Sequence, residues 1–164
     1  YGLKDLLSQS GAAHFIVLER LQDPGNLGTI LRAGEAAGIT GVIMDSKTAD
    51  IYNPKVIRST MGAVFRVPFV YVEDLKAALL QLKDHGVHLY AAHLKGQNPY
   101  DQEDYTESTG FLIGNEAQGL SDEIASLADT YVKIPMAGSV ESLNAAIASS
   151  VLMFEVARQR RNQK

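Results

Sequence analysis

The chain contains no cysteine and no tryptophan, and aromatic residues make up only 7% of it. The absence of cysteine excludes a disulfide framework and any metal site built on thiolates. No apolar run approaches the length of a membrane span, and no signal peptide is visible. We therefore expect a cytoplasmic protein without membrane association. Its 46% hydrophobic and 21% charged residues are typical of one folded domain.

The net charge of −4 has the wrong sign for a protein that holds nucleic acid by its overall electrostatic field. A nucleic-acid contact would have to come from local patches. One patch lies in the first half of the chain and consists of Lys47, Lys55, Arg58 and Arg66. The other closes the chain and consists of Arg158, Arg160, Arg161 and Lys164. The second patch also has a plainer interpretation, as a solvated helix end whose cations suit the helix dipole.

Short apolar runs alternate with stretches of helical spacing along the whole chain. We expect strands at 14–19, 41–45, 65–72, 87–92, 111–114 and 131–134, with Pro68 favouring an edge position for the third. We expect helices at 27–37, 53–60, 73–85, 121–128 and 142–158, with Asn26 as the N-cap of the first. The acidic stretch 96–109 is expected to be an exposed loop. The alternation predicts an α/β domain whose parallel sheet is covered on both faces.

Polar residues follow several of these strands, at the turns that lead into helical patterns. Ligands of a parallel sheet bind beyond the carboxyl ends of its strands, so these residues are expected to converge. The candidate site residues are Asn26, Arg32, Glu116, Ser142 and Asn144, with the backbone around Gly114, Ile134 and Leu143. Each also has a structural interpretation: Ser142 and Asn144 could cap a helix, and Arg32 could pair with Glu35 one turn later.

Motifs for several other chemistries are absent. There is no G-x-G-x-x-G after the first strand, no G-x-x-x-x-G-K-[ST] and no H-E-x-x-H. The histidines lack a partner at ligand spacing, so we interpret them as structural and expect no metal; they are His14, His85, His88 and His93. Ser142 is not part of a Ser-His-Asp order that would make it a hydrolase nucleophile.

Three stretches of the chain, in order, resemble the motifs of the SpoU/TrmH branch of the SPOUT RNA methyltransferases. The first is DPGNLGTILR at 23–32, and the second is IGNEAQGL at 113–120. The third runs from Ile134-Pro135-Met136 to Ser142-Leu143-Asn144. The resemblance extends from about residue 14 to residue 160. It implies an enzyme that transfers a methyl group from S-adenosylmethionine to the 2′-hydroxyl of a ribose in RNA.

The resemblance also implies an architecture and a cofactor site. The parallel-sheet SPOUT fold would carry a deep trefoil knot in its C-terminal part, around residues 110–150. The cofactor would lie bent in this knot, held mainly by backbone groups near Leu94, Gly114, Ile134 and Leu143. Members of the family are homodimers whose last helix contributes to the interface, so a homodimer is expected.

Roles for the polar residues follow from the same resemblance. Arg32 would act on the ribose hydroxyl as a base or as its activator, close to the cofactor bound by the partner subunit. Because a guanidinium stays protonated at neutral pH, this role requires an unusual local field or a phosphate relay. Asn26 would position the substrate or Arg32, and Glu116 would orient the site. Ser142 and Asn144 would complete the pocket for substrate and cofactor.

The two ends of the chain are similar to members that modify a guanosine in large-subunit ribosomal RNA. Residues 1–13 would then be a lead-in from an N-terminal RNA-binding domain, and residues 14–164 the catalytic domain. Transfer RNA remains an alternative substrate, because single-domain members of the family use it. Asn115 also departs from several ribosomal members, which have alanine at that position. A catalytically silent RNA-binding module of the same fold is the alternative to an enzyme. A small-molecule methyltransferase is disfavoured because so few residues are aromatic.

Overall fold

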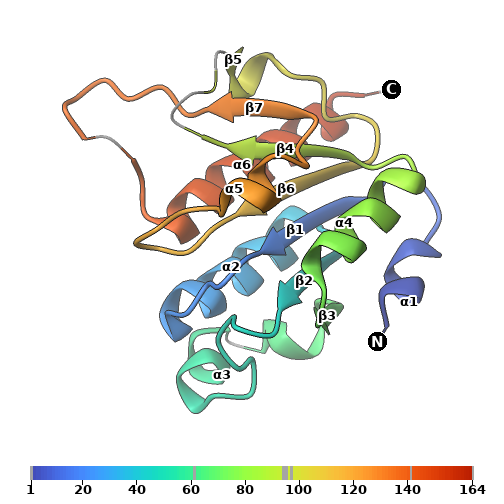
Figure 1. The fold of residues 1–164 in the computed structure, drawn as a ribbon, viewed down its shortest axis with the longest axis vertical. Coiled ribbons are helices and arrows are strands. Elements are labelled where there is room, and N and C mark those ends of the chain that lie inside the picture. Colours follow the sequence, from blue (N-terminus) through green and yellow to red (C-terminus); the bar gives the residue numbers. More distant parts are fainter. Residues whose placement is uncertain (1, 61, 94–95, 97, 141, 164) are drawn as a thin grey trace.

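A computed structural model of the chain describes residues 2–60, 62–93, 96, 98–140 and 142–163. A seven-stranded sheet runs through its centre in the order β3-β2-β1-β6-β4-β7-β5 (Figure 1). Its strands are β1 (His14–Leu18), β2 (Gly41–Asp45), β3 (Phe69–Val72), β4 (His88–Ala92), β5 (Asn98–Pro99), β6 (Thr109–Ile113) and β7 (Thr130–Lys133). Every neighbouring pair is parallel, which confirms the predicted sheet and brings the carboxyl ends of all strands to one edge.

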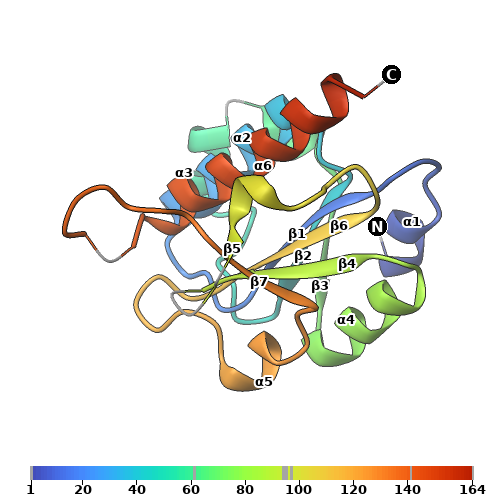
Figure 2. The ribbon, with the colours of Figure 1, turned by 90° about the horizontal axis from the view of Figure 1, so that it is seen from above.

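Helices cover both faces of this sheet, as the view from above in Figure 2 shows. One face carries α2 (Pro24–Ala37), α3 (Pro54–Thr60) and α6 (Ala145–Arg161). The other carries α1 (Leu3–Leu7), α4 (Leu75–Asp84) and α5 (Asp122–Ala125). Two short 3-10 helices, η1 (Ala63–Phe65) and η2 (Tyr100–Gln102), lie in the connections.

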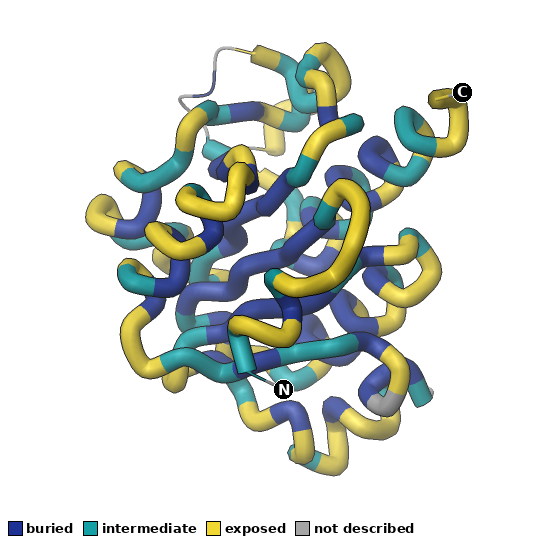
Figure 3. The backbone as a smooth tube through the Cα atoms, turned by 90° about the vertical axis from the view of Figure 1, so that its right-hand side faces the viewer, coloured by how far each residue is buried: buried dark blue, intermediate teal, exposed yellow. Residues whose placement is uncertain are grey.

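The central strands are buried on both sides, whereas the outer surfaces of the helices are exposed (Figure 3). All residues of β1 and of β6 are buried. Successive residues of a strand point to opposite faces, so Ile16 and Leu18 pack in the core with α2 and α6, while Phe15 and Val17 pack with α4. Burying one such side chain contributes about 1.5–3 kcal/mol, so the sheet is a firm base for the loops at its edge.

The predicted starts of the first and last long helices are wrong. Asp23, rather than Asn26, is the N-cap of α2, because its Oδ1 accepts the Gly25 N–H at 2.8 Å and Pro24 occupies the first helical position. The helix predicted from residue 142 begins at Ala145. Asn144 is the N-cap of this helix, which confirms its structural interpretation as a capping residue. Its Oδ1 accepts the N–H groups of Ala146 and Ile147 in the first turn.

The strand predicted at 65–72 is shorter than expected. It begins at Phe69, because residues 63–65 form η1. Pro68 lies just before the strand, and its carbonyl accepts the Val42 N–H at 3.0 Å. β3 is one of the two edge strands of the sheet, as the proline predicted.

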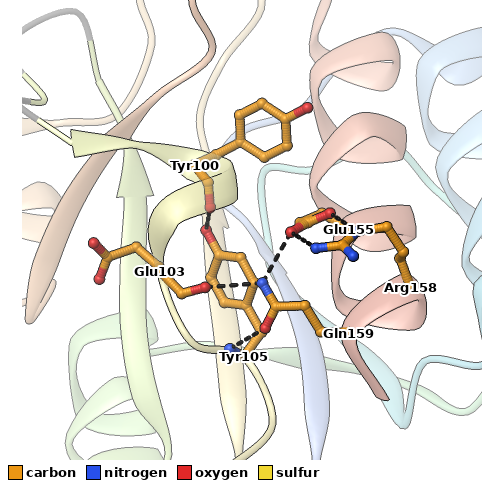
Figure 4. A network of polar contacts seen from close by, with 6 residues as sticks. All are labelled: Tyr100, Glu103, Tyr105, Glu155, Arg158 and Gln159. Carbon is orange, nitrogen blue, oxygen red and sulfur yellow. Dashed lines mark hydrogen bonds and ion pairs between the residues drawn. The ribbon is translucent and has the colours of Figure 1, made fainter. Parts of the chain in front are cut away.

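The acidic stretch 96–109 is not simply an exposed loop, and this prediction is wrong. It contains β5 and η2, and the Tyr105 ring is fully buried. Gln159 of α6 accepts the Tyr105 N–H at 2.7 Å and donates to the Glu103 carbonyl at 2.8 Å (Figure 4). The exposed carboxylates of Asp101 and Asp104 give the stretch its polar composition, although its backbone is fastened to α6.

Candidate functional site

A cleft of about 640 Å³ opens where β4, β6 and β7 end. This volume lies within the range of small-molecule sites in proteins. The cleft is lined by the segments that follow these strands and by the start of α6, namely Ala92, His93, residues 112–120 and 133–136, Ser142, Leu143, Ala145 and Ala148. Of the predicted site residues, those that line the cleft are Gly114, Glu116, Ile134, Ser142 and Leu143. The turns predicted to converge therefore do so.

The loop after β6 closes tightly on itself at the mouth of the cleft. The N–H of Asn115 donates to the Gly119 carbonyl at 3.1 Å, and the N–H of Gly119 donates to the Asn115 carbonyl at 2.8 Å. A Cβ on Gly114 would lie 2.2 Å from backbone atoms of Gly119 and Leu120. Gly119 has a φ of +70°. The loop thus requires glycine at both positions. At 114 there is no room for a Cβ beside the backbone of the same loop, and at 119 the backbone adopts a left-handed conformation that favours glycine.

Asn115 ties this loop to the loop after β1. Its Nδ2 donates to the Arg20 carbonyl at 2.8 Å, while its Oδ1 accepts the N–H groups of Ala117 and Gln118. Arg20 has a φ of +53°, and its N–H donates to the Asp45 carboxylate. An alanine could make none of the Asn115 side-chain bonds, so the asparagine has a structural reason in this chain.

Glu116 joins the loop after β6 to the start of α2. Its carboxylate accepts the N–H of Asp23 at 2.7 Å, the N–H of Gln22 at 3.1 Å and the side-chain amide of Asn26 at 3.4 Å. Burial by itself would raise the pKa of Glu116, but these donors outweigh burial and lower the pKa. The carboxylate is therefore ionised at neutral pH.

A hydrogen bond between two side-chain amides extends this contact to the start of α6. The Asn144 Nδ2 donates to the Asn26 Oδ1 at 3.1 Å. Asn26 is buried, and its amide can serve both neighbours because Nδ2 faces Glu116 while Oδ1 faces Asn144. Glu116, Asn26 and Asn144 form one chain of hydrogen bonds, which we call the carboxyl-edge network. Residues far apart in sequence thus meet beside the cleft.

Arg32 does not line the cleft of its own chain. It lies on an exposed part of α2, and its side chain forms no hydrogen bond or ion pair with any residue that the structure describes. The alternative, structural interpretation of Arg32 as a partner of Glu35 is wrong, because Glu35 holds Arg66 instead, with both of its carboxylate oxygens. Leu94 lies outside the described residues.

The histidines make structural contacts, with one difference from the prediction. His85 Nδ1 lies 2.9 Å from the Gln81 carbonyl oxygen, and His88 Nε2 lies 2.8 Å from Thr130 Oγ1. His93 stacks on Tyr131 at 5.1 Å and also lines the cleft, a place that the sequence reasoning missed. Its position directly after β4 was the available signal.

Among the residues that the structure describes, no three or more His, Asp or Glu side chains come together in a way that could hold a metal ion. No helix in this part of the chain is both long enough and apolar enough to span a bilayer.

Comparison with known proteins identifies the family. A family model described as the SpoU rRNA Methylase family matches residues 13–154. The chain belongs to the SpoU methylase family. A Staphylococcus aureus relative, assigned by name to the TrmH family of tRNA/rRNA methyltransferases, is 35% identical to this SpoU-family chain over 158 residues. That match covers 96% of the chain and 64% of the relative.

Solved structures resemble this SpoU-family chain over nearly its whole length. An rRNA methyltransferase from Sinorhizobium meliloti, solved with bound S-adenosylmethionine, is 36% identical with a TM-score of 0.90, covering 100% of the chain and 62% of that protein. A structure described as an RNA 2′-O ribose methyltransferase is 32% identical with a TM-score of 0.84, covering 93% of the chain and 58% of that protein. The chain thus spans less than two thirds of these relatives.

Proposed function

We propose that the chain transfers a methyl group from S-adenosylmethionine to the 2′-hydroxyl of a ribose in RNA. Membership of the SpoU family supports RNA methylation, and the relative described as an RNA 2′-O ribose methyltransferase supports the ribose as acceptor. The observation that carries the proposal is the carboxyl-edge network beside the cleft, because it unites all three motifs by which the chain resembles the family.

The cleft fits the proposed cofactor in size and in the nature of its walls. S-adenosylmethionine would supply the methyl group. Gly114, Ile134 and Leu143 border the cleft and would present backbone groups to the cofactor, together with Leu94. A family relative with 36% identity is described with this cofactor bound.

The remaining site residues would align the acceptor and accept its proton. Methyl transfer requires the hydroxyl oxygen, the methyl carbon and the sulfur to lie in line, so positioning supplies much of the acceleration. We propose that Glu116, Asn26 and Asn144 keep the loops in register, and that Ser142 contacts the substrate at the cleft. Arg32 would act as the base or its activator.

We propose a homodimer in which Arg32 of one chain reaches the cleft of the other. Arg32 is exposed and does not line its own cleft, which supports an action in a second chain. α6 exposes Ile147 by 53% and Phe154 by 46%, seven residues apart on one side of the helix. Phe154→Lys should shift the molar mass in solution from dimer to monomer, as measured by light scattering, and an unchanged mass would contradict the interface.

The RNA target and the wider architecture belong to the same proposal. We favour a guanosine of large-subunit ribosomal RNA over transfer RNA, in the cytoplasm, with residues 14–164 as the catalytic domain behind an N-terminal RNA-binding domain and residues 1–13 as the lead-in. The curated relative is longer than the match, which supports an additional domain. The proposed trefoil knot would leave the chain shorter than its full contour length when both ends are pulled.

Methylation of total RNA tests the proposed function. The full-length protein is incubated with methyl-labelled S-adenosylmethionine and total RNA, ribosomal and transfer RNA are separated, and nucleosides are identified after digestion. We expect label in a 2′-O-methylated nucleoside of ribosomal RNA. Arg32→Ala should lower the rate of methyl transfer at least about 100-fold, because proton transfer typically contributes that much. Arg32→Lys, which keeps the positive charge, is the companion variant. Binding without any transfer would favour the silent RNA-binding module.

A further inference from the structure

An exposed aromatic ring and unpaired cations lie together in the segment that follows β2. Tyr52 is 63% exposed, and Lys55 and Arg58 are exposed on α3. Of the four cations that form the first patch in the sequence, Arg66 is paired with Glu35 and its charge is compensated. The side chains of the other members form no hydrogen bond or ion pair with a described residue; they are Lys47, Lys55 and Arg58. This segment therefore has positive charge to offer a ligand.

The local charge contrasts with that of the whole chain. Residues 46–60 contain three cations and one carboxylate, Asp50, which gives a net charge of +2, whereas the chain carries −4. Asp50 Oδ1 accepts the Tyr52 N–H at 2.9 Å, so part of its hydrogen-bonding capacity is used within the loop. The segment therefore attracts an anionic ligand even though the chain as a whole is acidic.

The Tyr52 ring is held in place by other aromatic rings. It meets Phe69 edge to face at 6.2 Å, and Phe69 meets Tyr71 edge to face at 6.4 Å. The Tyr71 hydroxyl accepts the Ile51 N–H at 2.9 Å and donates to the Ala49 carbonyl. A ring that is both exposed and pre-positioned loses little conformational entropy when a planar group stacks on it.

The segment is attached to the proposed site through hydrogen bonds. The Ala49 N–H donates to the Leu21 carbonyl at 2.8 Å, and the adjacent N–H groups of Gln22 and Asp23 hold Glu116. Figure 1 shows α3 beyond the end of β2, and only β1 separates β2 from β6 in the sheet. At about 4.8 Å per strand, the loops after β2 and β6 leave the sheet roughly 10 Å apart.

We propose that Tyr52, Lys55 and Arg58 bind an unpaired stretch of the substrate RNA next to the cleft. One base stacks on Tyr52, and the phosphates lie beside Lys55 and Arg58. Aromatic side chains next to cations are the usual means of holding single-stranded nucleic acid, because every base offers a π-face and every nucleotide a charge. The inference rests on the proposed function, since it names how the RNA is held outside the reaction centre.

Binding of a short RNA to the full-length protein tests this surface. The probe is a fluorescein-labelled oligouridine of about twelve nucleotides, titrated by anisotropy at several salt concentrations. Tyr52→Ala should weaken binding roughly 5- to 150-fold, which corresponds to the loss of about 1–3 kcal/mol when a stacking ring is removed. Tyr52→Phe keeps the ring and should stay within about twofold, which separates stacking from misfolding.

The cations are tested by the salt dependence of the same titration. Lys55→Gln with Arg58→Gln should lower the slope of log affinity against log salt by about 1.4, because each phosphate contact to a single strand contributes about 0.7. Lys4→Gln with Lys76→Gln removes the same charge from exposed positions on α1 and α4, on the other face of the sheet, and should leave the slope unchanged.

The outcomes separate this surface from the proposed function. In one outcome, the wild-type protein methylates RNA, and Tyr52→Ala and the Lys55/Arg58 variant match it in oligonucleotide affinity and in KM for RNA. The proposed RNA-binding surface is then wrong, and the proposed function stands. If oligonucleotide binding depends on Tyr52 but the wild-type protein transfers no methyl group, the function fails and the surface stands. We expect both to hold, with a raised KM for RNA and a kcat within about twofold in Tyr52→Ala.

Discussion

Hydrogen-bonded networks hold the loops at both edges of the sheet, but only the network at the carboxyl edge surrounds a large open cleft. At the carboxyl edge, Glu116, Asn26 and Asn144 join loops around an open cleft. At the amino edge, the Arg160 guanidinium donates to four main-chain carbonyls at 2.8–3.1 Å, those of Ala12, Ala13, Tyr105 and Glu107. The first network borders a cleft of about 640 Å³, whereas the second joins main-chain groups of separate segments, beside a pocket of only about 120 Å³.

The difference teaches how one sheet separates stability from function. The partners of the Arg160 guanidinium are carbonyl groups that every residue carries, so these four bonds do not depend on the side chains of the residues that accept them. The carboxyl edge is built from side chains with specific donors and acceptors, and it keeps a concave surface, as sites of parallel sheets do. We therefore expect changes at the carboxyl edge to affect ligands first, and changes at the amino edge to affect the free energy of unfolding first.

The largest effect is expected for Gly114→Ala at the carboxyl edge. The new Cβ would meet backbone atoms at 2.2 Å, so the 114–120 loop must open and the cleft must change shape. Cofactor affinity, measured by calorimetry, should fall at least about 100-fold. Gly138→Ala is the matched control in the neighbouring loop, because its Cβ would meet nothing within 4 Å. Equal affinities in the two variants would show that the 114–120 loop does not shape the site.

Next in size is Arg160→Met, which removes the central donor of the amino edge. Four main-chain carbonyls, two of them at partly buried bonds, lose a charged partner, so the free energy of unfolding should fall by about 3 kcal/mol while cofactor affinity changes less than twofold. Arg161→Met on the same helix is the control, because Arg161 is exposed and forms no side-chain bond with a described residue; it should cost less than about 0.5 kcal/mol. Denaturant titration measures both, and equal losses would remove the contrast between the edges.

Over the window from pH 6.5 to 5, the smallest of these effects concerns His14, whose ring lies at the amino edge. Burial, with the nearby charge of Arg160, lowers its pKa from 6.5 to about 3. The unfolded chain therefore takes up a proton below pH 6.5 that the folded chain does not, and stability present above pH 6.5 is lost as the pH falls towards 3. The expected slope is about 1.4 kcal/mol per pH unit.

Replacement of this histidine isolates its contribution. His14→Leu should remove the slope between pH 6.5 and 5, at little cost, since Nε2 has no hydrogen-bond partner among the described residues. The pKa of Glu116 is lowered from 4.5, so the Glu116 carboxylate should stay ionised throughout this window. A slope that persists in His14→Leu would assign the acid sensitivity to other groups.

Much of the scaffold could be predicted from the sequence, because buried parallel strands and amphipathic helices leave a clear periodicity. The convergence of Glu116, Asn26 and Asn144 followed from their positions after strands, and the structure confirms that they meet. The cap of α2 was misplaced because Asp23 and Asn26 are both good caps, and only the position of Pro24 decides between them.

The rest depends on contacts between distant residues, which periodicity does not reveal. Acidic side chains made the 96–109 stretch look solvated, yet its backbone is held by Gln159 and Arg160 from the far end of the chain. Glu35 had a cation available three residues away but pairs with Arg66, which the sequence places 31 residues later. The knot and the position of Arg32 beside a partner follow only from the family resemblance, and they stay predictions.

Separate loops should act as one site, and a double-mutant cycle on the rate of methyl transfer tests this hypothesis. Asn26→Ala removes the shared amide, and Asn144→Ser removes the donor to it while serine can still cap α6. Each variant should lose about 100-fold in rate, and the double variant should lose little more than either, because the effects of groups that act as a unit are not additive. Losses that multiply, or single variants with undiminished rates, would contradict it.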